Sequence, residues 1–285
     1  MNALQVFPAP AKLNLSLLVT GRRADGYHLL QTVFRFIDFA DVLRIGVRTD
    51  GRIERLADLP GVPVDDDLTV RAARLLQRAA GSRLGAGIAL DKRLPLGGGL
   101  GGGSSDAATV LLALNRLWGL DWPRARLQAL ALELGADVPV FIFGRSALAT
   151  GVGEVLSALD LPPAWYLVLM PPVAVATARI FQDADLIRDS IPLTIPPFSL
   201  TAGRNDLEAV VCRHYPAVAQ HLAWLRQQGV ARMSGSGACV FAEFGSEASA
   251  RAVLARLPDN MRGVVARGLD RHPLWSAGAE DAAQE

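Results

Sequence analysis

The chain has almost no net charge and very little cysteine. Its 285 residues carry 29 basic and 28 acidic side chains, and the formal net charge of +1 provides no general field for nucleic acid or for an anionic membrane surface. The two cysteines, Cys212 and Cys239, are too few for a disulfide framework or a cysteine-rich metal site, so we expect both to be packing residues. Binding of any anion must therefore depend on a local site.

Long hydrophobic runs are also missing, although 51% of the residues are apolar. Charged residues or prolines interrupt every apolar stretch before about 18 residues, the length that a membrane-spanning helix needs. The first residues contain neither the basic segment nor the long apolar core of a secretory signal. These absences predict a cytoplasmic globular protein that binds neither membranes nor nucleic acid, with enough apolar residues for one large domain or two smaller ones.

Glycine, in contrast, is concentrated between residues 97 and 103, directly before Ser104 and Ser105. Glycine backbones can turn successive N–H groups toward one anion, and the start of a helix adds a partial positive charge. A flexible linker of the same composition would have polar neighbours. This run instead lies between an apolar strand-like segment, 88–96, and an apolar helix pattern, 107–118, so we predict that it binds phosphate.

Two other phosphate-binding patterns fit this run less well. The Walker pattern requires a lysine after the second glycine group, and no lysine follows Lys92. Gly97, Gly99 and Gly102 match the spacing of a dinucleotide-binding loop, which also needs an acidic residue at the end of a second strand about 20 residues on. Asp121 lies at that distance, but a helix pattern follows it and no strand ends there. A nicotinamide dehydrogenase is therefore the less favoured alternative.

Three segments in order along the chain resemble the motifs of the GHMP kinases, the superfamily of galactose, homoserine, mevalonate and phosphomevalonate kinases. Residues 95–105, around the glycine run, resemble the second motif, residues 10–15 the first and residues 233–241 the third. Within the superfamily, ADGYH at 24–28 and LGADVPVF at 134–141 are similar to the sequences of the 4-diphosphocytidyl-2-C-methyl-D-erythritol kinases. The similarity covers nearly the whole chain.

The resemblance implies an α+β, two-domain GHMP kinase fold. Its N-terminal ATP-binding domain, residues 1–160, would resemble domain 2 of ribosomal protein S5, its C-terminal domain, residues 161–275, would be ferredoxin-like, and the active site would lie in the cleft between them. Residues 276–285, small and acidic, are expected to be a disordered tail. The pattern of residues favours the same class, because helices and strands mix without regular βαβ repetition and so indicate mainly antiparallel sheets.

Hydrophobic periodicity locates the expected helices and strands. Strands are expected at 6–19 and 31–48, with turns at Gly21 and Gly26, and residues 49–51 carry a hairpin signal. Further strands are expected at 88–96, 147–150, 165–170, 238–244 and 263–269, and helices at 65–80, 107–118, 124–134, 178–187, 205–213, 218–228 and 247–257.

Asp137 is the expected general base of a kinase reaction. It lies in an apolar segment after a predicted helix, where a carboxylate is costly unless it has a partner. Lys12, in a run of small and apolar residues, is the expected partner, because its ammonium would keep Asp137 ionised and stabilise charge on the acceptor oxygen. In the GHMP kinases that the chain resembles, this lysine and this aspartate are the catalytic pair. A capping role for Asp137 and a solvated strand position for Lys12 are the alternatives.

The glycine loop and the helix after it would hold the β- and γ-phosphates of ATP, while Ser104 or Ser105 would offer a hydroxyl to phosphate or Mg²⁺, or cap the helix. Asp106 and Asp67 stand where the family carries asparagine. A carboxylate beside a triphosphate needs Mg²⁺ or a lysine, and Asp67 would accept from the adenine amine. ATP and Mg²⁺ are the expected cofactors, with the metal ligands unassigned. The residues expected to bind ATP are Pro95, Leu96, Gly97, Gly98, Gly99, Leu100, Gly101, Gly102, Gly103, Ser104, Ser105 and Asp67.

Tyr27 and His28 indicate a site for a cytosine base, because a base offers flat faces for stacking and an edge of donors and acceptors. By resemblance, Tyr27 stacks on the base, His28 binds its edge and Asn14 contacts the erythritol side. Phe181, in a predicted helix, is a second stacking face or a core residue. The residues expected to bind the substrate are Asn14, Tyr27, His28, Asp137, Thr177 and Phe181.

We therefore predict an ATP-dependent kinase for the 2-hydroxyl of 4-diphosphocytidyl-2-C-methyl-D-erythritol, a cytidine-diphosphate-linked polyol of the non-mevalonate (methylerythritol phosphate) route to isoprenoids. A homoserine- or mevalonate-type kinase is the near alternative. A noncatalytic nucleotide-binding protein on the same fold is the distant one. The sequence leaves the choice between a monomer and a homodimer open.

Overall fold

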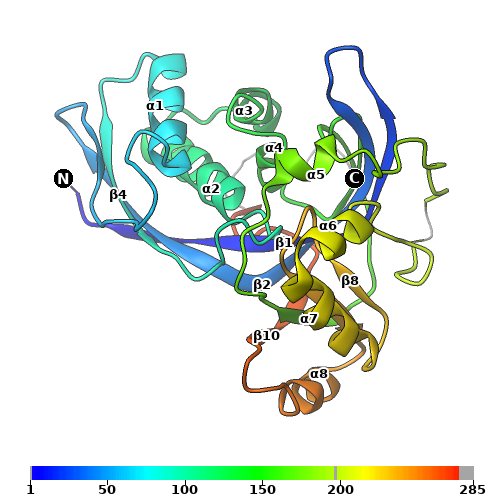
Figure 1. Cartoon of the computed structure of the whole chain (residues 1–285). Coiled ribbons are helices and arrows are strands. Elements are labelled where there is room, and N and C mark those ends of the chain that lie inside the picture. Colours follow the sequence, from blue (N-terminus) through cyan, green and yellow to red (C-terminus); the bar gives the residue numbers. More distant parts are fainter. Residues whose placement is uncertain (1, 196–197, 276–285) are drawn as a thin grey trace.

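The structure is a computed structural model, and it describes residues 2–195 and 198–275 (Figure 1). These ranges contain ten strands and eight helices. The strands are β1 (Gln5–Arg22), β2 (His28–Arg48), β3 (Ile53–Arg55), β4 (Gly85–Asp91), β5 (Ala147–Thr150), β6 (Val155–Ala158), β7 (Trp165–Leu169), β8 (Ala231–Met233), β9 (Val240–Phe244) and β10 (Gly263–Leu269). The helices are α1 (Leu68–Ala80), α2 (Gly102–Leu117), α3 (Arg124–Ala131), α4 (Val138–Phe143), α5 (Thr177–Gln182), α6 (Glu208–His214), α7 (Pro216–Arg226) and α8 (Glu247–Leu254).

A long antiparallel pair, β1 and β2, is the spine of the molecule (Figure 1). The two strands pair from Gln5 opposite Ile45 to Arg22 opposite His28, with three shifts in register. Valine, leucine and phenylalanine recur in both segments, with isoleucine in β2, and such side chains suit a pleated, buried surface. The two predicted strands are confirmed, and Gly26, with φ of +90°, lies in the turn between them. The predicted turn at Gly21 is wrong, because Gly21 lies within β1 and pairs with Leu29.

β2 joins the rest of the sheet. One of its edges pairs with β1, and the other pairs in succession with β5, β10 and β4. β10 continues to β7, and β9 and β8 follow, so that one ten-stranded sheet passes through the described part of the molecule. All of its pairs are antiparallel except β3 with β4. The predicted α+β class with a mainly antiparallel sheet is confirmed.

The turn at residues 49–51 does not close a hairpin, so this prediction is wrong. β3, which follows the turn, pairs in parallel with β4, and β4 occupies the place next to β2. β4 offers seven ladder positions to β2, whereas β3 has only three residues. β4 also places the fully buried side chains of Ala86 and Ile88 in the core, whereas Ile53 of β3 is only partly buried against it.

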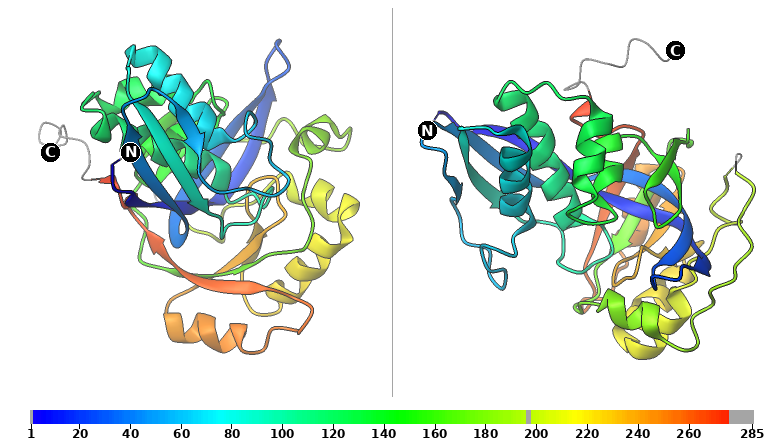
Figure 2. Two further views of the ribbon diagram at one scale, coloured as in Figure 1. Left: turned by 90° about the vertical axis from the view of Figure 1, so that its left-hand side faces the viewer. Right: turned by 90° about the horizontal axis from the view of Figure 1, so that it is seen from above.

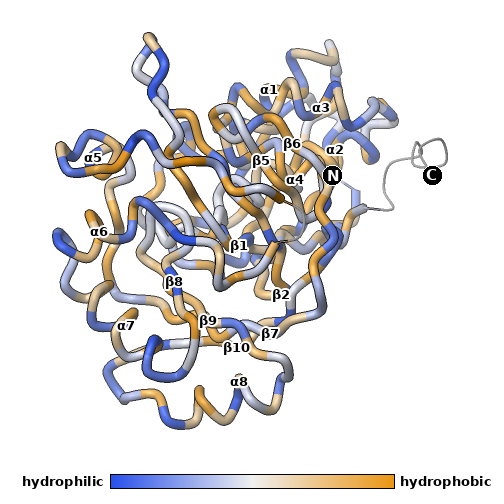
Figure 3. Tube along the Cα trace, turned by 90° about the vertical axis from the view of Figure 1, so that its right-hand side faces the viewer, coloured by the Kyte–Doolittle hydropathy of each residue, from blue (hydrophilic) through white to orange (hydrophobic). Residues whose placement is uncertain are grey.

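Three apolar clusters hold the layers together. Helices α1 to α4 cover one face of the N-terminal part of the sheet, and α2 packs against both β1 and β2 (Figure 2). Helices α6 and α7 pack on the C-terminal strands in a second cluster. The third cluster, which includes Leu13, Val33, Tyr166 and Phe241, joins the two. Figure 3 shows apolar residues gathered toward the interior. Both cysteines are free.

Several elements begin or end at residues that differ from the predicted ones. α2 begins at Gly102, before the apolar pattern at 107, because glycine and serine in the first turn carry no hydrophobic signal. α5 ends at Gln182, since Asp183 has an extended backbone. α4 was not predicted, because six consecutive apolar residues show no helical period. The short strands β6 and β8 also lie in segments for which no strand is expected.

The division into domains at residue 160 stays a prediction, because the sheet passes without a break from β2 through β10 to β7. The predicted tail, 276–285, lies outside the described residues. None of the helices within the described ranges has the length and apolar character needed to cross a lipid bilayer.

Candidate active site

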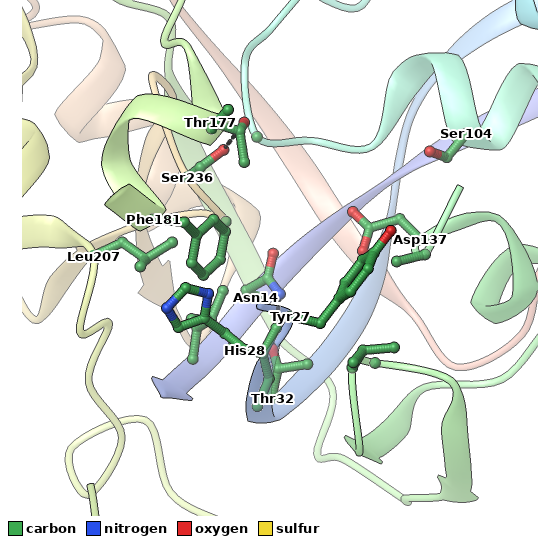
Figure 4. Close-up of a pocket in the computed structure, with 18 of the residues that line it drawn as sticks. Asn14, Tyr27, His28, Thr32, Ser104, Asp137, Thr177, Phe181, Leu207 and Ser236 are labelled. Atoms are coloured by element: carbon green, nitrogen blue, oxygen red, sulfur yellow. Dashed lines mark hydrogen bonds between the residues drawn. The ribbon is translucent and has the colours of Figure 1, made fainter. Parts of the chain in front are cut away.

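A pocket of about 830 Å³ opens where β1, the tip of the β1–β2 hairpin, the glycine loop and α5 meet (Figure 4). Its walls come from both halves of the chain, because residues of β1 and β2 face residues 177–182 and 235–236 across it. Nine of the predicted site residues line it, namely Lys12, Asn14, Tyr27, His28, Gly99, Ser104, Asp137, Thr177 and Phe181.

The structure brings Lys12 and Asp137 together, although 125 positions separate them in the sequence. Lys12 Nζ lies 3.2 Å from Asp137 Oδ2, and the lysine side chain is 3% exposed whereas the aspartate side chain is 40% exposed. A solvated position for Lys12 is therefore wrong. Asp137 lies directly before α4, not at the end of a helix, and its side chain makes no capping hydrogen bond. The carboxylate is thus left open to the pocket beside a buried cation.

Asn14 holds Lys12 in place. Both residues project from the same face of β1, two positions apart, and Lys12 Nζ donates to Asn14 Oδ1 at 2.5 Å. The Asn14 amide is oriented in turn, because its Nδ2 donates to Thr32 Oγ1 at 2.8 Å and Thr32 Oγ1 donates to the carbonyl of Ser16 at 2.6 Å. This support for Lys12 was not predicted from the sequence. The signal was present, because two residues that lie two positions apart on a predicted strand share one face.

The glycine loop lies close against Lys12, and two of its glycines have no room for a side chain. A Cβ on Gly101, which has φ of +69°, would lie 2.9 Å from Phe141 Cζ and 3.0 Å from Lys12 Cε. A Cβ on Gly99 would meet the carbonyl oxygen of Ser234 at 2.1 Å. Lys12 Nζ also donates to the Gly99 carbonyl at 3.1 Å. Glycine is therefore required where the loop packs between β1 and the segment before β9.

The loop presents unpaired donors. Within the described ranges, no main-chain amide of residues 97–104 donates a hydrogen bond to the protein, whereas the Gly98 and Leu100 carbonyls accept from Cys239 and Lys12 amides. The carbonyls thus fix the loop and leave its N–H groups for a ligand. Pro95 is half-buried, and Leu96 and Gly97 are exposed at the outer end of the loop. Such an array of amides before a helix favours an anion.

The two serines after the loop have different surroundings. Ser104 lines the pocket, whereas Ser105 is fully buried and its hydroxyl has no partner among the described residues. Neither serine caps α2, since Gly101 occupies the N-cap position and the helix begins at Gly102. The capping alternative is therefore wrong, and Ser104 is the serine with access to a ligand.

Asp106 meets a lysine behind the loop. Lys92 Nζ lies 2.8 Å from Asp106 Oδ2 and 2.5 Å from Asp41 Oδ2, and all three side chains are largely buried. Asp41 Oδ1 also accepts from the main-chain amides of Arg93 and Leu94. Two carboxylates share one ammonium here, and burial together with Asp41 raises the pKa of Asp106 to about 7. Sequence reasoning required a lysine or a metal for Asp106 but did not identify Lys92.

Asp67 is engaged away from the pocket. It is the N-cap of α1, where its Oδ1 accepts from Thr69 N at 2.9 Å and from Thr69 Oγ1 at 2.7 Å. Its other oxygen lies 3.5 Å from Arg55 Nη1, and the residue is 3% exposed. A contact between Asp67 and adenine stays a prediction, and it competes with this capping role.

Two of the predicted base-binding residues, His28 and Phe181, lie side by side in the pocket, whereas the ring of Tyr27 points toward Asp137 in Figure 4. The rings of His28 and Phe181 lie 5.0 Å apart, so Phe181 faces the pocket and is not only a core residue. Tyr27 is 64% exposed on the hairpin tip. Thr177 Oγ1 and Ser236 Oγ lie 2.6 Å apart and connect α5 to the segment before β9. Burial, then Arg188 and Arg22, lower the pKa of His28, which favours a neutral imidazole.

No cluster of three or more His, Cys, Asp and Glu side chains able to hold a metal ion occurs in the ranges 2–195 and 198–275. The pocket residues that offer oxygen to a cation include the Asp137 carboxylate and the Ser104 hydroxyl. Mg²⁺ usually enters such sites with one or two protein ligands and the phosphates of a substrate. A cation would therefore depend on a phosphate ligand.

Two family models match separate parts of the chain. Residues 67–145 match the family model of the GHMP kinases N terminal domain, and residues 198–263 match that of the GHMP kinases C terminal domain. The chain is 66% identical over 271 residues to a 4-diphosphocytidyl-2-C-methyl-D-erythritol kinase of Thiobacillus denitrificans, covering 95% of this chain and 98% of that protein. It is 63% identical over 270 residues to one of Nitrosospira multiformis, covering 94% and 92%.

Solved structures show the same likeness. A crystal structure of a 4-(cytidine 5'-diphospho)-2C-methyl-D-erythritol kinase has a TM-score of 0.81 and 37% identity, covering 93% of this chain and 99% of that chain. The mevalonate kinase of Methanococcus jannaschii has a TM-score of 0.65 at 12% identity, covering 94% and 99%. The second likeness is one of fold alone.

Replacing Gly101 with alanine tests the close packing of the loop. The new Cβ would both strain a positive φ and press on Phe141 and Lys12, so we expect Gly101→Ala to lower the free energy of unfolding by roughly 2–4 kcal/mol. Gly119 is the matched control, because it has φ of +65° and nothing within 4 Å of its Cβ position. Gly119→Ala should cost about 1 kcal/mol. Equal losses in urea unfolding would show that contact with Lys12 contributes nothing.

Replacing Asp106 with asparagine tests the surplus carboxylate. A folded pKa of about 7, above the ordinary 3.8, means that the folded state favours protonated Asp106, so its contribution to stability is lost as pH rises through 7. We expect Asp106→Asn to raise the unfolding midpoint at pH 8 by roughly 2–4 °C, about 1 kcal/mol, and by little at pH 6. Thermal unfolding in EDTA without nucleotide is the measurement. A larger gain at pH 6 than at pH 8 would contradict the assignment.

Proposed function

The chain belongs to the 4-diphosphocytidyl-2-C-methyl-D-erythritol kinases, a family of the GHMP kinases, and from this premise we propose that it transfers the γ-phosphoryl group of ATP to the 2-hydroxyl of 4-diphosphocytidyl-2-C-methyl-D-erythritol. One observation carries the proposal. The contact of 3.2 Å between Lys12 Nζ and Asp137 Oδ2 lies in the same pocket as the glycine loop, where an acceptor hydroxyl and a terminal phosphate would meet.

The glycine loop would bind the β- and γ-phosphates. Its free amides at residues 97–104 and the start of α2 present positive ends of dipoles to the anion. Because glycines fix the loop against β1, these donors need little rearrangement as charge moves to the leaving oxygen. The Ser104 hydroxyl is close enough to the pocket to add a further donor.

Asp137 would act as the general base. The 2-hydroxyl of the substrate gives its proton to the carboxylate while its oxygen forms a bond to the γ-phosphorus, the bond from that phosphorus to the β–γ bridging oxygen breaks, and ADP leaves. Lys12 stays protonated. Its ammonium keeps Asp137 anionic and stabilises the negative charge on the attacking oxygen. Lys12 is buried and donates hydrogen bonds to Asn14 and Gly99, so its positive charge is held in a fixed position.

Mg²⁺ belongs to the proposal as a companion of ATP. When bound, it would neutralise charge on the phosphates and hold them in line with the acceptor. The Ser104 hydroxyl and the phosphates themselves would hold it, since a cluster of metal-ligating side chains is not found among the described residues. The Asp106 carboxylate already pairs with the Lys92 ammonium, so it does not need the metal ion to balance its charge.

The far end of the pocket favours a nucleobase over a small alcohol. Tyr27, His28 and Phe181 provide aromatic surface and a polar edge, which homoserine or mevalonate would leave unused. A noncatalytic nucleotide-binding protein would not need the Lys12 ammonium and the Asp137 carboxylate in contact beside the glycine loop. We therefore place both alternatives below the cytidine-linked polyol. A cytoplasmic location and a monomer or homodimer remain parts of the proposal.

Asp137→Asn tests the mechanism. We expect the rate of ADP release with the diphosphocytidyl substrate to fall at least about a hundredfold, because a positioned general base contributes about that factor or more. Nucleotide affinity should change little, since the loop amides are untouched. Coupled ADP release gives the rate, and calorimetry gives the affinity for ATP.

Glu133→Gln is the control for this experiment, because Glu133 is an exposed carboxylate four positions earlier that does not line the pocket. It should retain full activity. An Asp137→Asn enzyme that turns over at the rate of the unaltered protein would remove Asp137 from the mechanism.

A further inference from the structure

Arg188 holds the two sides of the base-binding end of the pocket. It follows α5 and was not singled out in the sequence. Its Nε donates to His28 Nε2 at 3.2 Å, so it reaches from the C-terminal half of the chain to the start of β2. Its Nη2 donates to the carbonyls of Phe181 at 3.1 Å and Asp183 at 2.7 Å, and its Nη1 donates to the carbonyl of Leu186 at 3.0 Å.

The chemistry of the guanidinium fixes the proton on His28. A guanidinium has five N–H donors and no acceptor, so the ring nitrogen that faces it must be unprotonated. His28 Nε2 is that nitrogen, and a neutral imidazole then carries its proton on Nδ1. Among the described residues Nδ1 has no hydrogen-bond partner, and the ring lines the pocket. The Nδ1–H group is therefore available to a ligand.

Three carbonyls hold Arg188 itself, so the direction of its Nε–H does not depend on His28. The guanidinium uses four donors in a planar fork, and three of them are bound to carbonyls of its own segment. The Phe181 carbonyl is one of the three, and the Phe181 ring lies 5.0 Å from the His28 ring. One side chain thus binds both the His28 ring and the main chain of Phe181.

We propose that Arg188 is a positioning residue that holds His28 in the Nδ1–H tautomer and thereby makes the pocket select cytosine over uracil. This rests on the proposed function, in which His28 faces the edge of the base. Cytosine N3 is a hydrogen-bond acceptor, which Nδ1–H satisfies, whereas uracil N3 carries a hydrogen and would oppose a second donor. A buried donor facing a donor loses its hydrogen bond, and a site built this way rejects the wrong partner strongly.

The tautomer is measured first, without substrate. The chain has four histidines, and ¹⁵N-detected imidazole spectra of the full-length protein distinguish a protonated Nδ1 from a protonated Nε2, with a His28→Asn variant assigning the signal. We expect Nδ1–H in the unaltered protein, a shift toward Nε2–H in Arg188→Met, and Nδ1–H kept in Arg188→Lys, which retains a cationic donor. Protonated Nε2 in the unaltered protein, or an unchanged tautomer in Arg188→Met, would overturn the proposal.

Arg213→Met is the matched structural control. Arg213 pairs with Asp183 and Asp185 in the same loop but does not contact His28, so its loss loosens the loop without removing the donor to Nε2. The His28 tautomer should stay unchanged in this variant. A change as large as that in Arg188→Met would assign the effect to the loop and not to Arg188.

Selectivity is measured next, as kcat/KM for the cytidine diphosphate-linked substrate against its uridine diphosphate-linked analogue. We expect Arg188→Met to reduce this ratio roughly tenfold or more, mainly through a higher KM for the cytidine compound, with kcat changed less than about threefold. Arg188→Lys should keep most of the ratio. An unchanged ratio in Arg188→Met would refute the role in selectivity. Failure of the unaltered protein to phosphorylate either compound would refute the proposed function while the tautomer result stands separately.

Discussion

The structure depends on the buried ammonium of Lys12, which lies beside the glycine loop. The chain contains two lysines, and both lie against the glycine loop or the helix that follows it. Lys12 lies on the pocket side of the loop, where its charge is balanced by Asp137 and by the carbonyl dipoles of Asn14 and Gly99. A buried charge is tolerated only with such partners. Because these partners come from β1, the loop and the start of α4, the requirement to satisfy one cation fixes three segments relative to each other.

The same requirement joins the C-terminal half to the loop. Ser234 Oγ donates to the Gly99 carbonyl at 2.9 Å, and the main-chain N–H of Asn14 donates to Ser234 Oγ at 3.2 Å. Asn205 Nδ2 in turn donates to the carbonyls of Met233 and Gly235, both at 2.8 Å. Residues 233–236 of the third motif therefore hold the glycine loop of the second motif in place, and this explains why glycine and serine are needed in residues 233–236. It also places Ser236 at the pocket wall.

Periodicity and motif spacing predicted the spine of the fold and the contact between Lys12 and Asp137, because both leave local signals. Alternating apolar residues mark β1 and β2, and an isolated lysine in an apolar strand marks Lys12. The parallel pairing of β3 with β4 leaves no such signal, since strand order depends on contacts between distant segments. Lys92 and Arg188 were missed for the same reason. The residues around Lys92 and Arg188 do not indicate their partners, and only the fold shows that Asp106 and His28 are within reach.

One end of the pocket is built from packed backbone and the other from exposed side chains. This difference agrees with the mevalonate kinases, which share the fold of this chain. The end at the glycine loop is made of packed backbone and a buried lysine, with little freedom to vary without losing stability. The end at His28 and Phe181 is made of side chains on the short helix α5 and near the hairpin tip, where Tyr27 is 64% exposed. Substitutions there cost little folding energy, so specificity can change while the fold stays. Mevalonate kinases keep this fold at 12–14% identity, as expected if the core is retained and the substrate end is replaced.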